Sequence, residues 1–171
     1  GEATLPQDVV DHIRMLKGRK TLVWLALTNI NSTDVAAVGV IRNVCDLAKE
    51  NGLDVVLYPH VSFRTGTVAE CEHLRKLADR LNLGISFNLC HFLCQNDPAT
   101  VEAAISSVAP HLKLVQISGA NEMPPGKPDW NELIKPLGEG DFDMARVLRT
   151  LDETGYQGPV NLQCYKIPGP A

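Results

Sequence analysis

The stretch LGISFNLCHFL, residues 83–93, has an apolar body that ends in polar side chains. Its first five residues are apolar or small enough for a buried strand. Asn88, Cys90 and His91 follow, although polar groups in a core cost free energy unless they find partners. A strand that is apolar along its body and polar at its carboxyl end is typical of strands that lead into a binding site. We therefore predict a buried strand over 83–93 whose end opens into a functional site.

The same alternation of a short apolar run and an amphipathic run repeats along the chain. Strands are predicted at 21–28, 53–60, 83–93, 112–120 and 158–165. Helices are predicted at 7–18, 32–52, 67–82, 97–111 and 141–155. Strands this apolar are covered on both faces, which indicates a parallel α/β sheet. Two architectures fit: part of a (β/α)8 TIM barrel, which normally needs about 250 residues, or an open doubly wound sheet, which the length favours.

The composition is that of a soluble globular protein. The 171 residues are 44% hydrophobic with a formal net charge of −4, which predicts one domain over 1–171. No basic cluster exceeds KGRK at 17–20, so nucleic acid is not an expected partner, and no apolar run is long enough for a membrane span. We see no signal peptide, and five scattered cysteines are typical of reduced thiols in a cytoplasmic protein.

Sequence motifs for cofactor binding and nucleophilic catalysis are missing. There is no Walker loop and no GxGxxG, so no nucleotide cofactor is expected. There is no GxSxG, and Cys90 beside His91 is a poor nucleophile pair, because neighbours on a strand point to opposite faces.

Polar side chains gather where the predicted strands end. They are Thr28 and Asn29, Tyr58 and His60, Asn88 and His91, Gln116 and Ser118, and Gln163 and Tyr165. Carboxyl ends of parallel strands meet at one edge, so these groups are expected to share a rim. Amides, hydroxyls and imidazoles offer the alternating donors and acceptors that a hydroxylated ligand requires. The sequence therefore predicts binding of a small-molecule carbohydrate.

His60 and His91 are the rim side chains expected to titrate near neutral pH, so either could act as general base or acid. They could also hold one divalent metal such as Mn, Zn or Co, although no rim carboxylate would balance its charge. A hydrogen-bonded structural role is the alternative for each. Arg64, just past the second strand, could bind an anionic group such as phosphate, or be an exposed arginine without such a role.

The irregular segment 121–140 is rich in proline and glycine. A segment of this length in a compact domain is usually a lid or a binding loop. Its Trp130 could contact a ligand or cover the core. The run GEGDFD at 138–143 places acidic residues at a helix start, where capping explains them.

Several motifs together resemble a known family. LYPH, GISFNLCHFL, VQISGA and PLGEGDFDMARVLRTLDETGYQGPVNLQCY are similar to the sugar phosphate isomerase/epimerase family with the xylose isomerase-like TIM barrel. The five strands would correspond to the fourth through eighth of that barrel, so the first three βα units are expected to be absent. The resemblance then implies either a fragment of a longer protein or a homo-oligomer that completes the open sheet edges.

The resemblance also implies a changed metal site. Better-known members hold one divalent metal through a Glu, an Asp, a His and a second Glu, which here fall at Tyr58, Asn88, Gln116 and Gln163. His91 matches a position that contacts substrate.

The resemblance predicts a sugar or sugar-phosphate isomerase or epimerase, or a related lyase. It would act by proton transfer next to a carbonyl, through His60 or His91. Tyr58, Tyr165 and Arg64 join the three amide side chains as expected substrate contacts. The alternative is a non-catalytic carbohydrate-binding relative.

Overall fold

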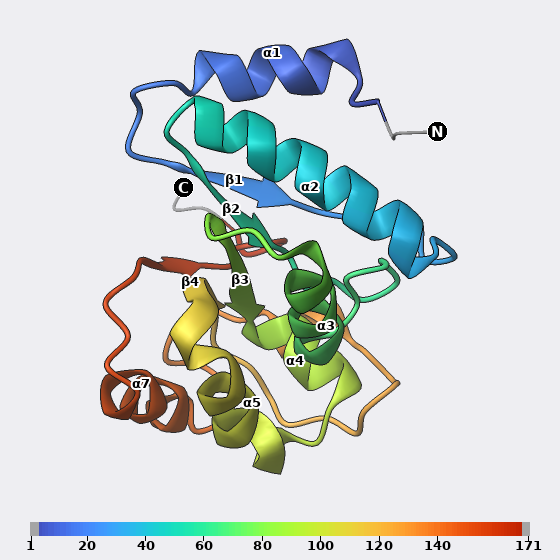
Figure 1. Cartoon of the computed structure of the whole chain (residues 1–171). Coiled ribbons are helices and arrows are strands. Elements are labelled where there is room, and N and C mark those ends of the chain that lie inside the picture. The colour runs from blue at the N-terminus through green and yellow to red at the C-terminus, as the bar shows by residue number, and fades with distance from the viewer. Residues whose placement is uncertain (1–3, 169–171) are drawn as a thin grey trace. The chain divides into compact units, whose positions relative to one another are not determined.

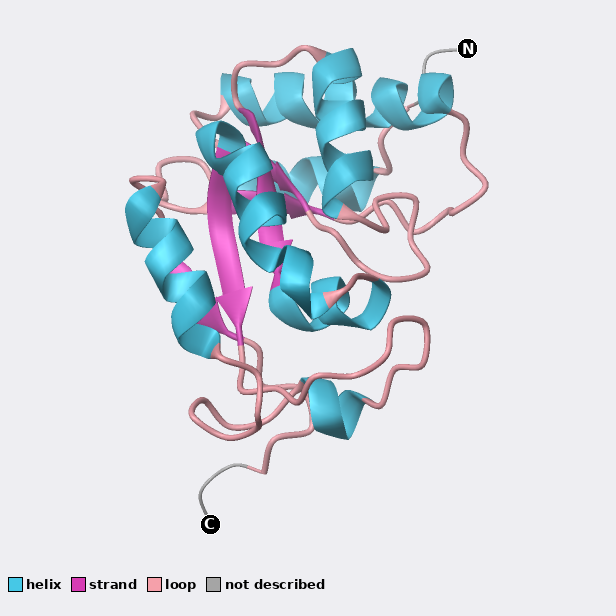
Figure 2. Ribbon diagram, turned by 90° about the horizontal axis from the view of Figure 1, so that it is seen from below, coloured by secondary structure: helices cyan, strands magenta, loops and turns pink. Residues whose placement is uncertain are grey.

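The computed structural model describes residues 4–168, in which helices and strands alternate (Figure 2). The chain divides into two compact units, the first ending at Ile85 and the second beginning at Ser86. No helix within the described residues is long and apolar enough to cross a membrane. All five cysteines are free, and four of them are buried, as expected for reduced thiols.

The first unit carries three parallel strands in sequence order. Its elements are α1 (Gln7–Met15), β1 (Leu22–Leu25), α2 (Asp34–Glu50), β2 (Asp54–Leu57), α3 (Val68–Ala78) and the start of β3 (Leu83–Asn88). Leu22 lies opposite Asp54, and Val55 lies opposite Leu83. α1 lies beside α2 (Figure 1), and α2 packs against both α3 and β2 through a buried apolar face.

The two longer helices of this unit begin where the sequence offers caps. The Thr33 side chain accepts a hydrogen bond from the backbone N–H of Ala36 at the start of α2. At α3, Thr67 and Glu70 form a capping box, in which each side chain accepts a hydrogen bond from the other residue's backbone N–H. Both caps come from polar residues just before an apolar run, so these starts were predictable.

The second unit holds the last residues of β3 and two further parallel strands. Its elements are α4 (Leu89–Gln95), η1 (Pro98–Thr100), α5 (Val101–Val108), η2 (Ala109–His111), β4 (Leu112–Ile117), α6 (Trp130–Leu133), α7 (Met144–Glu153) and β5 (Val160–Leu162). β4 pairs with β5 in parallel, with Gln116 opposite Asn161. α5 and α7 lie side by side (Figure 1), joined by an ion pair between Arg146 and Glu102 at 2.5 Å.

Most predicted elements are shorter than expected, and the structure gives a clear reason for two of them. The predicted strand 83–93 ends at Asn88, and the residues after it form α4, because the Asn88 side chain caps that helix. The predicted helix 67–82 ends at Ala78, because Asp79 adopts a left-handed conformation with φ 51°. Leu81, which lies beyond the end of the helix, is therefore 99% exposed.

The strand arrangement bears on the two predicted architectures. Strands that follow one another in sequence are neighbours, in the order β1-β2-β3 in the first unit and β4-β5 in the second. A doubly wound sheet reverses its order at a switch point, whereas a barrel does not. The arrangement within each unit confirms the parallel α/β class and favours the partial TIM barrel. That the chain forms a single domain stays a prediction.

Candidate functional site

In the first unit, Tyr58 and His60 follow β2 directly, as predicted. The Tyr58 backbone N–H donates to the Leu25 carbonyl at 3.0 Å, and its carbonyl accepts from the Thr65 hydroxyl at 2.8 Å. These bonds hold the turn after β2 against the end of β1. The centroids of the Tyr58 and Trp24 rings are 4.4 Å apart, so the Tyr58 ring packs against an aromatic neighbour. Trp24 is a neighbour that sequence reasoning missed.

The His60 ring is fixed in both position and tautomer. It stacks on the Phe63 ring with centroids 4.0 Å apart and an interplanar angle of 20°. Its Nδ1 lies 2.6 Å from the Val61 carbonyl oxygen. A carbonyl oxygen can only accept, so Nδ1 must carry a proton. In the neutral imidazole, Nε2 then carries the lone pair, which makes it the basic nitrogen.

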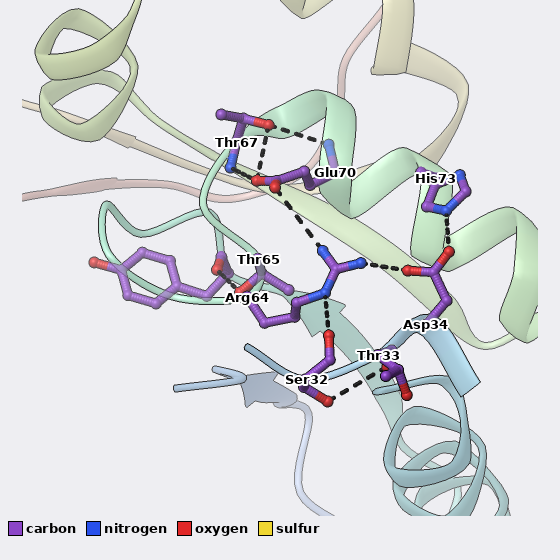
Figure 3. Close-up of polar contacts among 9 residues, drawn as sticks. Ser32, Thr33, Asp34, Arg64, Thr65, Thr67, Glu70 and His73 are labelled. Atoms are coloured by element: carbon purple, nitrogen blue, oxygen red, sulfur yellow. Dashed lines mark hydrogen bonds and ion pairs between the residues drawn. The ribbon is translucent and has the colours of Figure 1, made fainter. Parts of the chain in front are cut away.

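Arg64 is held by ion pairs and is not an exposed arginine. Its side chain is 13% exposed, and its guanidinium bonds to the Asp34 carboxylate and donates from Nε to the Ser32 carbonyl at 3.0 Å (Figure 3). The Glu70 carboxylate lies 3.9 Å away on the other side. These contacts fasten the turn after β2 to the first turns of α2 and α3. Binding of an anionic ligand by Arg64 stays a prediction.

His73 and Asp34 form a second part of this network. The His73 Nε2 lies 2.7 Å from the Asp34 carboxylate (Figure 3), so this surface histidine has a partner that the sequence did not reveal. The hydrogen bond from His73, followed by that from Arg64, lowers the pKa of the Asp34 carboxyl, although burial opposes them. The carboxylate is therefore favoured in the folded chain.

In the second unit, Asn88 is buried and uses both ends of its amide. Its Oδ1 accepts from the His91 backbone N–H at 3.3 Å and from the Cys90 thiol at 3.0 Å. Its Nδ2 donates to the Gln116 Oε1 at 2.9 Å. The structure thus brings together two of the predicted rim amides, 28 residues apart in the sequence.

Cys90 lies beside His91 in the first turn of α4, so the strand argument against this pair was wrong. The thiol is 1% exposed. Burial raises its pKa to about 12, against a smaller opposing effect of a hydrogen bond from the Gln163 amide. The thiol is therefore protonated at neutral pH and can donate to Asn88. The Gln163 backbone N–H donates to the Ile117 carbonyl at 2.8 Å, which places this residue at the end of β4.

The remaining predicted rim residues have different surroundings. The buried His91 ring meets the Trp130 ring edge to face with centroids 5.4 Å apart, so the long segment reaches this histidine. The Ser118 hydroxyl donates to the Leu133 carbonyl at 3.3 Å. Tyr165 is exposed, with the Lys166 ammonium 5.4 Å from its ring centroid. Substrate contact by these residues stays a prediction.

The irregular segment 121–140, which follows β4, is flanked at both ends by residues that backbone hydrogen bonds hold in place. Gly119 and Lys135 exchange two backbone hydrogen bonds of 3.0 and 2.8 Å, and the Phe142 N–H donates to the Ala120 carbonyl at 3.0 Å. A Cβ on Gly119 would lie far inside van der Waals contact with the Pro136 carbonyl, and one on Gly140 would do so with the Ala120 carbonyl. Residues 124–129 between these ends are exposed.

The second-unit residues that match the family's metal ligands do not fit a hard divalent cation. Such ions prefer anionic oxygen ligands, whereas Asn88, Gln116 and Gln163 are neutral. The Asn88 oxygen already accepts two hydrogen bonds, and the Gln116 oxygen accepts one from Asn88. Among residues 4–168 no three His, Cys, Asp or Glu side chains are grouped so that they could hold a metal. His60 lies in the first unit and His91 in the second, and metal binding by them stays a prediction.

The sequence matches the model of one protein family, described as xylose isomerase-like TIM barrel, over residues 14–170. A comparison with curated proteins finds no match. Similar solved structures include a D-psicose 3-epimerase from Clostridium cellulolyticum H10 with D-tagatose, at TM-score 0.71 and 18% identity. An IolI protein with a bound zinc atom has TM-score 0.69 and 17% identity.

A fusion of a xylose isomerase-like TIM barrel with 4-hydroxyphenylpyruvate dioxygenase is also similar, with TM-score 0.75 and 21% identity over 96% of this chain and 27% of that protein. The epimerase and the zinc-bound protein are each matched over 91% of this chain, which spans 54% and 58% of their respective lengths. At these identities the likeness shows the fold alone.

Proposed function

Because this chain belongs to the xylose isomerase-like TIM barrel family, we propose that it acts on a small carbohydrate, moving a proton at a carbon next to a carbonyl as a sugar isomerase or epimerase does. The family match and the epimerases among the similar structures support this substrate class. The rim residues support it too, since they are amides, imidazoles and phenols that can bond hydroxyl groups.

His60 is the residue that we propose as proton acceptor, and its tautomer is the observation that carries the proposal. Its Nδ1–H bond to the Val61 carbonyl leaves the lone pair on Nε2, and stacking on Phe63 fixes the ring. A general base needs an oriented lone pair. An imidazole held in one tautomer meets this requirement without a carboxylate.

In the second unit, the proposed role of Asn88, Gln116 and Gln163 is to bond sugar hydroxyls. Each offers an amide, and Gln116 and Gln163 use only part of theirs in the contacts described above. His91 is the alternative proton acceptor. We further propose Tyr58, Tyr165 and Arg64 as substrate contacts.

Solvent exchange tests the proposal directly. The full chain is incubated in D2O with D-psicose, D-tagatose and other ketohexoses, and proton NMR follows loss of the hydrogen next to the carbonyl. H60N keeps an N–H that can donate to Val61 but lacks the Nε2 base, so exchange should fall at least roughly 100-fold. H12N, at an exposed histidine of α1, is the matched control and should exchange as the wild type does. Exchange by H60N at the wild-type rate would remove His60 from the mechanism.

A non-catalytic carbohydrate-binding protein is the second candidate. Asn88 and Gln116, two neutral amides that match metal ligands of the family, are hydrogen-bonded to each other. This favours the second candidate, because amides cannot take up a proton from carbon at neutral pH. Calorimetry on the same sugars separates the two candidates. Binding without solvent exchange would support the second, and any exchange that depends on the protein would exclude it.

A further inference from the structure

The loop 122–131, which lies within the irregular segment after β4, is closed at its neck by Asn121 and Glu132. The Asn121 backbone N–H donates to the Glu132 carbonyl at 2.7 Å, and the Asn121 side-chain amide donates to the Glu132 carboxylate. A surface loop whose two ends meet in this way is an Ω-loop, a class that is frequently functional. Loop 122–131 can therefore move about its neck while the chain on either side stays in place.

The residues beyond the neck are anchored, whereas the tip of the loop is not. Leu133 is fully buried, and Gly119 and Lys135 exchange the two backbone hydrogen bonds already described. Residues 124–129 are exposed. Regions with exposed backbone and little burial open at a lower free energy than the core around them. The loop is therefore expected to open without unfolding of the strand that precedes it.

The tip of the loop is held against α4 by its backbone. Within the described part of the chain, the hydrogen bond that joins residues 124–129 to α4 runs from the Gly126 N–H to the Cys94 carbonyl at 2.9 Å. Cys94 lies in the last turn of α4, where carbonyls have no partner within the helix. Gly126 has φ 81° and follows Pro125, the pair that a type II turn favours, so the tip keeps its shape and can move as one piece.

Trp130 places its ring against His91 from the end of this loop. The two rings meet edge to face with centroids 5.4 Å apart, and His91 is 5% exposed. A carbohydrate that gives a proton to His91 has to come within hydrogen-bonding distance of the imidazole. The indole covers one side of that imidazole, so this side becomes accessible when Trp130 moves away.

The backbone that carries Trp130 offers little resistance to this motion. α6 is a single turn, in which the Leu133 N–H donates to the Asp129 carbonyl and the Ile134 N–H donates to the Trp130 carbonyl, each at 3.0 Å. A helix this short is marginal in water by itself. Opening exchanges these bonds and the Gly126 bond for bonds to water, which costs little in net free energy.

We propose that loop 122–131 is a lid of the candidate site, which covers His91 with Trp130 in the closed form and opens about the neck between Asn121 and Glu132 to admit a carbohydrate. That a carbohydrate enters rests on the proposed function, whereas the opening itself does not. A lid of this kind keeps water away from the reacting groups and closes over the bound ligand.

Hydrogen exchange of the ligand-free full chain, followed by NMR, tests the opening. With each rate corrected for that of an unprotected amide, the Gly126 and Ile134 N–H groups should exchange equally fast, because one motion frees both. The Asn121 and Lys135 N–H groups hold the ends and should exchange at least roughly 100-fold more slowly. Gly126 exchange as slow as that of Lys135 would overturn the inference. This comparison uses the wild type and needs no variant.

Replacing Trp130 by alanine tests the role of the indole. In W130A, Gly126 should exchange at least roughly tenfold faster, and diethyl pyrocarbonate, which acylates accessible imidazoles, should modify His91 at least roughly tenfold faster. W24A removes the same side chain from the first unit and should change neither rate. W130F keeps a ring on His91 and should stay closer to the wild type. Unchanged modification of His91 in folded W130A would overturn the role of Trp130.

D-tagatose tests whether the lid responds to a ligand. At a saturating concentration it should slow Gly126 exchange at least roughly tenfold and leave Lys135 exchange unchanged, because it stabilises the closed form. Binding that leaves the Gly126 rate unchanged would overturn the link between lid and ligand. If calorimetry finds no binding of any ketohexose, the proposed function fails for these sugars, and the ligand-free rates still decide whether the loop opens.

Discussion

Replacing Asn88 by alanine should lower the free energy of unfolding by about 2–4 kcal/mol. Loss of the cap on the His91 N–H accounts for about 1 kcal/mol. The Gln116 oxygen, now buried without its donor, accounts for about 1–3 kcal/mol more. The thiol of Cys90 is a weak donor, so its lost bond adds little.

A double-mutant cycle isolates the bond between the two amides. N88A and Q116A each leave a buried partner without its hydrogen bond. The double variant should therefore lose less free energy of unfolding than the two single variants lose together, by roughly 1–2 kcal/mol. Urea unfolding of the full chain gives the four values, with Trp130 fluorescence in a W24F background as a probe in the second unit. N131A, at an exposed asparagine of α6, should stay within about 0.5 kcal/mol of the wild type. A coupling energy of zero would refute the reasoning, since the amides would then not be bonded in solution.

Three further expectations follow from the described contacts. T67A should cost about 1 kcal/mol in urea unfolding because it removes the capping box of α3, and T67S should recover most of it; equal costs for the two variants would contradict the capping role. The pKa of the Asp34 carboxyl is lowered on folding, so this group stabilises the fold above its unfolded pKa and loses that contribution as the pH falls through its folded pKa. D34N should therefore flatten the acid side of a stability–pH curve below about pH 4, and a curve parallel to the wild type would speak against the pairing. Elemental analysis of the chain purified without chelators should find well under one magnesium per chain, because the amides that match the family's metal ligands are neutral; a full equivalent of magnesium would contradict this, whereas an equivalent of zinc or cobalt would support metal binding by His60 or His91.

Local signals in the sequence predicted most element starts. Asp97 accepts from the Ala99 N–H ahead of Pro98, and Asp143 accepts from the Ala145 N–H at the start of α7, so capping accounts for part of the GEGDFD run as predicted. The change from strand to helix at Leu89 was not predictable from periodicity. Every residue from Leu89 to Cys94 is buried, and an apolar run that is covered on all sides shows no helical period.

The contacts of the candidate site were harder to predict than its residues. The strand-end pattern identified Asn88 and Gln116, but not that they bond each other. Arg64 and Asp34 are 30 residues apart, and no local rule relates such positions. The hydrogen bond from the Cys90 thiol to Asn88 was not predicted either, because it forms where the chain changes from β3 to α4, a change that the sequence did not reveal.

The fixed ends of the segment 121–140 determine which of its residues can change without disturbing the fold. Gly119 and Gly140 hold the two ends where no other residue fits, so the exposed stretch 124–129 can change without disturbing the strand. Within this stretch the Gly126 N–H donates to the Cys94 carbonyl of α4 at 2.9 Å. Lengthening the chain on either side of that bond should cost little, because doubling the length of a flexible loop costs only about 0.6 kcal/mol in closure entropy. Evolution or design can therefore vary the residues before Trp130, which contacts His91, while the two ends of the segment stay in place.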